Sequence, residues 1–220
     1  MKSDNMSFPA GLLDKIKYHG ETKKFKKGSY IFRDKLVTDN IFILLSGKAS
    51  IDKLNASGQQ RTIFILDPVT LLNEPTNASA TSSVNCVAFE DCLVLSINRS
   101  VFFDLMANDF ELTKIVVEQI SRKARRMYRQ LKNAVSATKV EKRLAAKLWK
   151  LCRDYGTQTE NGTLIDIEMT SENLADLIGI RRETVSRALK VLQDEGLILY
   201  KKRKIIIPNP DDLSRYFKGM

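Results

Sequence analysis

The sequence is poor in the residues that build metal centres, disulfide frameworks and histidine-based catalytic sites. Its 220 residues include three cysteines and a single histidine. The cysteines Cys86, Cys92 and Cys152 are too few and too scattered for a disulfide framework or a zinc module. An enzyme would need a nucleophile beside a base, or a metal constellation, and the chain offers neither pattern. We therefore expect no metal, no cofactor and no enzymatic activity. For Cys86 and Cys92 we expect burial as small apolar side chains, with redox sensing as the alternative.

Long hydrophobic runs are also missing. The longest, such as Ile41–Leu45, are far too short to cross a bilayer. The first 20 residues are charged and lack the continuous apolar segment of a signal peptide. These features predict a cytoplasmic protein with reduced thiols and no membrane partner.

The charge balance is basic. Lysine and arginine number 36 against 26 acidic residues, which gives a formal net charge of +10. Such a charge suits an anionic partner, for example nucleic acid. Because many soluble proteins carry the same surplus as solvated lysine, the charge alone is weak support. The length leaves room for one large domain or two modest ones.

Short β-type runs follow one another from Phe25 to Asn98. Turn residues separate them, for example at Lys27-Gly28, Ser46-Gly47 and Asn55–Gly58. Strands at such regular short spacing predict a sandwich or jelly roll. The expected strands are Tyr30–Phe32, Ile41–Leu45, Ala49–Ile51, Arg61–Leu66, Ser83–Phe89 and Cys92–Ile97.

The pattern then changes to a helical period, with a short helix and a long helix expected within Arg99–Val135. Apolar residues of the long helix recur at alternating spacings of three and four, which is typical of a seam that pairs with a second helix. Packing on the protein's own sheet is the alternative, but the charged run Arg122–Arg126 beside the seam favours a dimer. The seam residues are Val117, Ile120, Ala124, Met127, Leu131 and Ala134.

A new helix is predicted after the long one. Thr138 and Glu141 have the spacing of a capping box, in which a hydroxyl and a carboxylate bond free N–H groups of the first turn. This helix would turn its leucines inward and end before Gly156. We expect Val135–Thr138 to be a domain boundary and hinge. The inward residues are Leu144, Leu148 and Leu151.

Residues 167–196 carry the most informative pattern. Thr170 or Ser171 caps a short helix, Gly179-Ile180 makes a tight turn, and a second helix spans Arg182–Glu195 until Gly196 ends it. Two short helices around a glycine-containing turn form a helix-turn-helix, whose second helix enters the DNA major groove. The residues expected to be buried are Leu174, Ala175 and Ile178 in the first helix and Val185, Leu189 and Leu192 in the second.

The exposed face of the second helix carries side chains that can read base edges. Arginine presents two donors to guanine, and a carboxylate accepts from cytosine. The alternative is the solvated polar face that any surface helix has. We take Thr170 and Ser171, at the start of the first helix, as further DNA-binding candidates. The candidates on the second helix are Arg182, Glu183, Ser186, Arg187 and Lys190.

The next segment weakens that alternative. Leu197–Tyr200 and Ile205–Ile207 flank the cationic run Lys201–Lys204, which predicts a hairpin with a basic tip. A hairpin of this kind beside a helix-turn-helix is the wing of a winged helix, and its cations contact phosphates. Lys201 and Lys202 are the candidate contacts.

A specific resemblance emerges at these residues. One run resembles the helix-turn-helix of the Crp/Fnr family of transcription regulators, namely LADLIGIRRETVSRALKVLQDEGLI. The family pattern is met at Arg182–Val185 and Ser186-Arg187. A second run resembles the first strands of the family's cyclic-nucleotide-binding fold, namely KKGSYIFRDKLVTDNIFILLSGKASI. A long dimerisation helix and a hinge follow, as in the family. The resemblance implies that Glu183, Ser186 and Arg187 recognise the DNA site, with Arg182 as a further reader.

The resemblance also implies an α+β architecture in three parts. Residues 1–110 would form a β-roll sensor or effector domain of the jelly-roll type. Residues 111–137 would form the dimerisation helix and hinge, and residues 138–220 a winged helix-turn-helix DNA-binding domain. The expected partners are double-stranded DNA and a second copy of the chain.

Family members that bind cyclic AMP carry a phosphate cassette with glycines, a glutamate for the ribose and an Arg-Ser pair for the phosphate. The matching region is Pro68–Glu74, followed by Thr81–Val84. Its glutamate matches the pattern, but Val69 and Asn73 stand at the glycine positions and Ser82 at the arginine position. Because a phosphate would lack its main charge-assisted partner, cyclic AMP is not the expected effector.

With cyclic AMP set aside, we expect the effector site to be a pocket between the sheet and the long helix. This pocket would bind an unidentified small molecule or no ligand at all. Plain surface polarity is the alternative for each residue that would line it. An iron–sulfur sensor needs four cysteine ligands, and the lone His19 is expected at the surface. The candidate pocket residues are Thr70, Asn73, Glu74, Ser82, Ser83 and Tyr128.

We therefore expect a bacterial regulator that activates or represses transcription, in which an effector shifts the population of DNA-binding geometries. Activation would make RNA polymerase a further partner, and the sequence does not locate a patch for it. The alternative is a protein-interaction or ligand-binding module without DNA binding, which predicts no strong salt dependence on duplex DNA.

Overall fold

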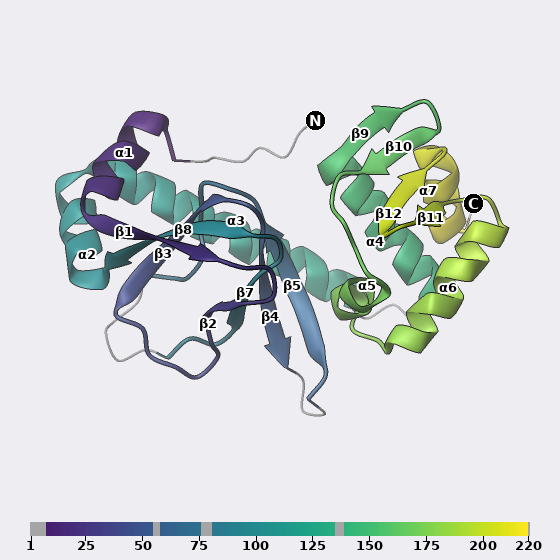
Figure 1. The fold of residues 1–220 in the computed structure, drawn as a ribbon, viewed down its shortest axis with the longest axis horizontal. Coiled ribbons are helices and arrows are strands. Elements are labelled where there is room, and N and C mark those ends of the chain that lie inside the picture. The colour runs from purple at the N-terminus through teal and green to yellow at the C-terminus, as the bar shows by residue number, and fades with distance from the viewer. Residues whose placement is uncertain (1–7, 55–57, 76–80, 135–138, 220) are drawn as a thin grey trace. The chain divides into compact units, whose positions relative to one another are not determined.

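The computed structural model describes residues 8–54, 58–75, 81–134 and 139–219 (Figure 1). Contacts divide the chain into two compact units. Of the described residues, the N-terminal unit comprises 8–53, 62–75 and 81–134, and the C-terminal unit comprises 139–219 together with 54 and 58–61. Within the described ranges, no helix is long and apolar enough to cross a membrane.

The N-terminal unit is built on two four-stranded sheets, as the β-rich prediction required. Their strand orders are β1-β8-β3-β6 and β2-β7-β4-β5. The pairings of β8 with β1 and β3, and of β7 with β2 and β4, are antiparallel. The strands are β1 (Gly20–Phe25), β2 (Tyr30–Phe32), β3 (Asn40–Ser46), β4 (Ala49–Leu54), β5 (Gln60–Leu66), β6 (Thr70–Leu71), β7 (Asn85–Ala88) and β8 (Cys92–Asn98).

Strand β3 shows how this unit acquires two cores. Side chains alternate between the faces of a strand, so Ile41 and Ile43 enter one hydrophobic cluster while Phe42 and Leu44 enter the other. The cluster of Phe42 and Leu44 lies within the roll, with side chains of β4, β5 and β7. The cluster of Ile41 and Ile43 takes its remaining side chains mainly from β8 and the helices. A strand buried on both faces explains the continuous apolar run in the sequence.

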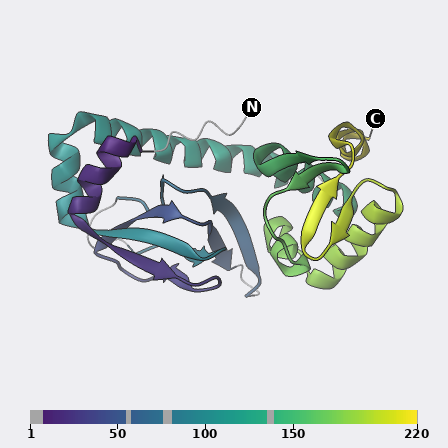
Figure 2. The same cartoon turned by 45° about the horizontal axis from the view of Figure 1, so that its top comes forward.

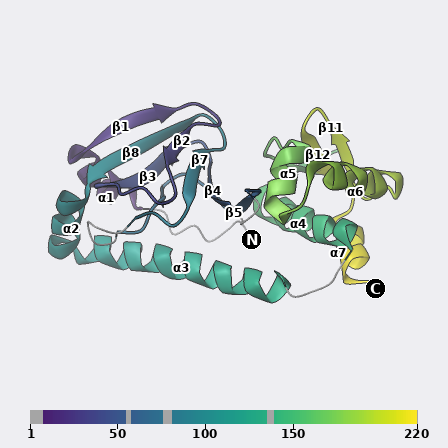
Figure 3. The same cartoon turned by 90° about the horizontal axis from the view of Figure 1, so that it is seen from below.

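Three helices complete the N-terminal unit: α1 (Ala10–Tyr18), α2 (Arg99–Asn108) and α3 (Phe110–Ala134). Helices α1 and α2 lie close together at one end of the unit (Figure 2). Figure 3 shows α3 running along one side of the sheets. Phe102 of α2 and Leu112 of α3 are buried in the same cluster as Ile16 of α1. The predicted short and long helices are therefore present.

The C-terminal unit combines helices with a four-stranded sheet of order β11-β12-β10-β9. Leu144, Leu148 and Leu151 of its first helix are buried, as predicted. Trp149 of the same helix meets Phe217 edge to face, with ring centroids 6.0 Å apart. The elements are α4 (Val140–Tyr155), β9 (Gly156–Thr159), β10 (Gly162–Ile165), α5 (Ser171–Ile178), α6 (Arg182–Asp194), β11 (Leu199–Lys201), β12 (Lys204–Ile207) and α7 (Pro210–Lys218).

The predicted capping box of α4 lies only partly within the described residues. The residue at the cap position is Lys139, whose side chain makes no capping hydrogen bond. Thr138 itself lies outside the described residues. Lys139 has a non-helical backbone, with φ −51° and ψ 147°, and its carbonyl accepts the first helical bond, from Arg143 N. The helix thus begins one residue later than the box requires, which moves Glu141 out of the reciprocal position.

Candidate nucleic-acid interface

Helix α5 begins at a capping box. The Thr170 hydroxyl accepts a 3.1 Å hydrogen bond from Asn173 N, and Asn173 Oδ1 accepts a 3.0 Å bond from Thr170 N. Of the two predicted caps, Thr170 is therefore the one used, and half-buried Ser171 is the first residue of the helix. The structure gives Thr170 a role within the protein, and its contact with DNA stays a prediction.

The turn between α5 and α6 is fixed from both sides. Gly179 has φ +69°, a left-handed conformation that glycine adopts without strain, and its N–H donates to Ala175 O at 2.8 Å. From α4, the Arg143 guanidinium donates to the carbonyl of Ile178 at the end of α5. The second helix of the pair therefore starts from a defined position.

Helix α6 has one buried and one exposed face, as the sequence predicted. Val185, Leu189 and Leu192 are buried. All five candidate base readers are exposed, namely Arg182, Glu183, Ser186, Arg187 and Lys190. Sequence reasoning missed Arg181, an exposed cation at the cap position of α6. The run of two arginines before the helix was the signal that could have identified it.

The wing is a hairpin of β11 and β12 with cations at its tip. Lys201 pairs with Lys204, and the two residues of the turn, Lys202 and Arg203, have φ +51° and +64°. A two-residue turn with both φ values positive favours Asn-Gly, so two cations here carry backbone strain. Strained backbone clusters at functional sites, so the strain marks the wing tip as a candidate contact. All four cations of the run Lys201–Lys204 are exposed.

Comparisons with known proteins agree with this geometry. Residues 142–216 match the Crp-like helix-turn-helix domain, and residues 22–109 match the cyclic nucleotide-binding domain. The chain belongs to the Crp/Fnr family of transcription regulators. The family prediction made from the helix-turn-helix motif is thus confirmed.

Relatives of this Crp/Fnr regulator cover almost its whole length. It is 26% identical to the CRP-like cAMP-activated global transcriptional regulator of Mycobacterium tuberculosis, over 87% of this chain and 85% of the relative. It is 25% identical to the anaerobic regulatory protein of Bacillus subtilis, over 96% and 90%. The fold matches the c-di-GMP responsive global regulator of Xanthomonas campestris with a TM-score of 0.81 at 19% identity, over 91% and 100%. These names differ in their signals, so family membership leaves the effector open.

The predicted dimer seam of the regulator is exposed at two of its residues, while Ile120 packs in part against the core of its own unit. Val117 is 54% exposed and Met127 45% exposed, while Ile120 and Ala124 are half-buried. The side chains of Leu131 and Ala134 lie outside the described residues. The buried side chains of α3 belong to a neighbouring face, which includes Leu112, Ile115, Val116, Gln119 and Lys123. The alternative of packing on the sheet therefore fails at Val117 and Met127.

The six candidate effector residues differ in their surroundings. Asn73 is 5% exposed, and its side chain bonds β3, accepting from Phe42 N at 2.8 Å and donating to Asn40 O at 2.9 Å. Ser82 Oγ donates to Val84 O, and Ser83 O accepts from Lys53 Nζ. These polar atoms are engaged within the protein.

The other three candidates lie on separate elements. Thr70 is half-buried on β6, and Tyr128 of α3 is 68% exposed. Glu74 Oε1 lies 3.9 Å from Lys123 Nζ. Sequence reasoning missed Lys123, because a lysine within a run of cations is usually solvated. Burial lowers the pKa of Lys123 below its ordinary value.

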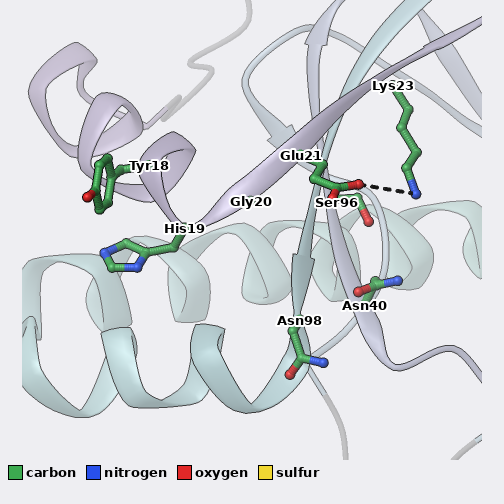
Figure 4. Close-up of a pocket in the computed structure, with 8 residues that line it drawn as sticks. All are labelled: Tyr18, His19, Gly20, Glu21, Lys23, Asn40, Ser96 and Asn98. Atoms are coloured by element: carbon green, nitrogen blue, oxygen red, sulfur yellow. Dashed lines mark ion pairs between the residues drawn. The ribbon is translucent and has the colours of Figure 1, made fainter.

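A separate groove of about 420 Å³ opens beside the end of α1 (Figure 4). Glu21 and Lys23 form an ion pair on its wall at 3.9 Å. None of the candidate effector residues lines it. Its lining consists of Tyr18, His19, Gly20, Glu21, Lys23, Asn40, Ser96 and Asn98. His19 is exposed, as expected.

Both cysteines of the roll are buried, as predicted. Burial raises the pKa of Cys86 well above its ordinary value and that of Cys92 to about 11. The Cys92 thiol also donates to Lys48 O. Because the thiolate is the reactive form, these environments favour a core role over redox sensing.

Proposed function

We propose that this regulator binds DNA as a homodimer and places the α6 helix of each copy in the major groove of an inverted repeat. The observation that carries the proposal is the exposed face of α6, with Arg182, Glu183, Ser186, Arg187 and Lys190, beside a strained wing of cations. Enzymatic activity forms no part of this function.

Helix α6 and the β11–β12 wing have different roles in recognition. Arginine on α6 pairs with guanine O6 and N7, and Glu183 accepts from cytosine N4. The wing residues Lys201 and Lys202 contact phosphates, which positions the unit without reading sequence. A basic chain of this kind gains affinity by releasing counterions from DNA.

The exposed seam of α3 supports the dimer. Val117 and Met127 present apolar surface that a second α3 would cover. Two recognition helices related by the dimer axis then occupy half-sites about 34 Å apart, one turn of the duplex. We assign residues 1–110 to the sensor, 111–137 to the dimer helix and hinge, and 138–220 to DNA binding, in a cytoplasmic protein.

Any effector differs from cyclic AMP. The Mycobacterium relative is cAMP-activated and the Xanthomonas relative c-di-GMP responsive. The family resemblance puts Ser82 at the position of the phosphate-binding arginine, and the Ser82 hydroxyl donates to Val84 O. A small molecule of another chemistry would act through the roll, and a promoter that the protein activates would add RNA polymerase as a partner.

Selection from random duplex DNA tests the function. Purified full-length protein is incubated with the library at near-physiological salt with no ligand added, and binding is then measured across a salt series. We expect an inverted repeat and an affinity that falls steeply with salt. Binding that shows neither sequence preference nor salt dependence would favour a protein-interaction module and overturn the proposal.

A further inference from the structure

The inner face of α3 changes from apolar to polar along its length. In its first turns Leu112, Ile115 and Val116 are buried in the hydrophobic cluster. In the following turns the inward positions hold Gln119 and Lys123, which are only 6% and 9% exposed. The helix therefore meets the roll through apolar contacts in its first turns and through polar contacts in the turns that follow.

Both polar side chains bond one short segment, Val69–Glu74. Gln119 Oε1 accepts a 2.8 Å bond from Leu71 N, and Gln119 Nε2 donates to Val69 O at 3.4 Å. One turn later, Lys123 Nζ donates to Leu72 O at 3.2 Å and lies 3.9 Å from Glu74 Oε1. The helix is thus tied to main-chain atoms of the segment at successive turns.

The same segment is held to strand β3 on its other side. Val69 N donates to Leu44 O at 2.6 Å, and the Asn73 side chain bonds the main chain of Phe42 and Asn40. Val69 has φ +63°, a left-handed conformation that a β-branched residue adopts only when its surroundings impose it. By the resemblance described in the sequence analysis, this segment lies within Pro68–Glu74, part of the expected nucleotide-binding region.

A lysine at the inner face has a cost that an apolar residue would avoid. Burial disfavours its charged form, so a leucine or methionine would pack there without that penalty. A buried polar group can instead specify one arrangement of the elements it joins. One turn further, the Arg126 guanidinium lies 4.7 Å from the Phe64 ring centre of β5, a cation–π contact that continues the polar series.

We propose that Gln119 and Lys123 form an internal latch that holds the Val69–Glu74 segment to α3 without any effector. This inference rests on the proposed function, because its consequence is read as DNA binding. A fixed α3 presents one dimer geometry, and preorganised recognition helices lose less freedom on binding two half-sites. The latch therefore keeps the ligand-free protein competent to bind its operator.

The test compares Lys123→Met with Lys114→Met in the full-length protein. Methionine has the length of the lysine stem but cannot donate, and it packs well in irregular spaces. Lys114 is the matched control, since it lies on the same helix, is 56% exposed and pairs only with Glu111 among the described residues. Gln119→Met is a second latch variant, which removes the bond to Leu71 N without changing charge.

Hydrogen exchange of the peptide covering residues 69–74 and affinity for the selected repeat are measured without ligand. We expect both latch variants to exchange about tenfold faster and to bind the repeat about tenfold more weakly, since hydrogen bonds of this kind are lost. Lys114→Met should change neither quantity.

Two results would overturn the latch. Unchanged exchange in both latch variants would show that the segment is held without them, whatever the DNA result. Faster exchange with unchanged operator affinity would show that the latch does not set DNA-binding competence. Failure of the wild-type protein to bind duplex DNA would instead count against the proposed function, and the exchange comparison would still decide whether the contacts hold the segment.

Discussion

The hydroxyl of Tyr200, on the wing strand β11, donates a 3.1 Å hydrogen bond to the main-chain carbonyl of Met169. Met169 N in turn donates to Arg203 O, in the wing turn, at 2.9 Å. Met169 immediately precedes Thr170, the cap of α5. The wing is therefore anchored at two points to the start of the helix-turn-helix, so its cations keep a fixed position beside α6.

Tyr200→Phe should weaken binding to all DNA sequences alike. The change removes one neutral hydrogen bond, worth about 0.5–1.5 kcal/mol, and loosens the wing without touching the base readers. We expect a loss of roughly two- to tenfold in affinity, measured by fluorescence anisotropy on the selected repeat and on an unrelated duplex. Tyr18→Phe is the control, because Tyr18 is 88% exposed. A change in base preference would contradict this role for the wing.

Arg187→Ala should abolish sequence preference and leave salt-sensitive residual binding. A bidentate arginine contact with guanine is worth about 1–3 kcal/mol of discrimination. Arg153→Ala makes the same chemical change on α4, at a side chain 56% exposed. Repeating the selection with both variants checks the prediction. An Arg187→Ala protein that still discriminates among sites as the wild type does would refute the assignment.

Val117→Asp should produce a monomer that no longer binds the repeat. Its carboxylate would have to be buried unpaired between two α3 helices, at a cost of several kcal/mol. Val117 is a sharper probe than Ile120, which also packs against the core of its own unit. Sedimentation at micromolar concentration reports the state of assembly, with Arg129→Asp as the control, at an exposed residue about 120° around α3 from Val117. A dimeric Val117→Asp protein would place the interface elsewhere.

The buried carboxyl of Asp52 should make the stability of the N-terminal unit depend on pH. Asp52 accepts bonds from Ser50 Oγ at 2.9 Å and Thr62 Oγ1 at 2.7 Å, and burial raises its pKa above the ordinary value. The fold thus favours the protonated form. Its contribution to stability is full below the unfolded pKa and is lost as pH rises through the raised pKa in the folded state.

Asp52→Asn removes this titration, so its stability relative to the wild type should increase as pH rises from about 4 toward neutrality. Urea unfolding followed by circular dichroism at several pH values measures the difference. Fluorescence of Trp149, the single tryptophan, reports the C-terminal unit and serves as the internal reference. A pH-independent difference between the two proteins would show that Asp52 does not titrate in this range.

Sequence patterns sufficed where burial follows a simple period. In α6, Val185, Leu189 and Leu192 recur at helical spacing, and the structure buries all three. The six predicted strands occur for the same reason, since each is an apolar run bounded by turn residues. Gly179 was identifiable because few other residues adopt its backbone conformation without strain.

Elements with polar sequences were missed. Strand β1 reads GETKKF and shows no apolar alternation, because it is an edge strand whose middle residues face solvent. The β9–β10 hairpin is polar along β9 for a similar reason. Lys123 was missed because its burial depends on the Val69–Glu74 segment, which is distant in sequence and is brought close only by the fold.

The turn at Lys202 and Arg203 lowers the stability of the fold but supplies cations for DNA binding. Both residues hold a backbone conformation that Asn-Gly would adopt more easily. Screening variants of this regulator for heat resistance would therefore enrich Asn and Gly at the wing tip. Under the proposed function, these more stable variants would have lost two cations that contact phosphates, and they would bind DNA more weakly. Selection for thermal tolerance alone would erode regulation, so both properties have to be assayed together.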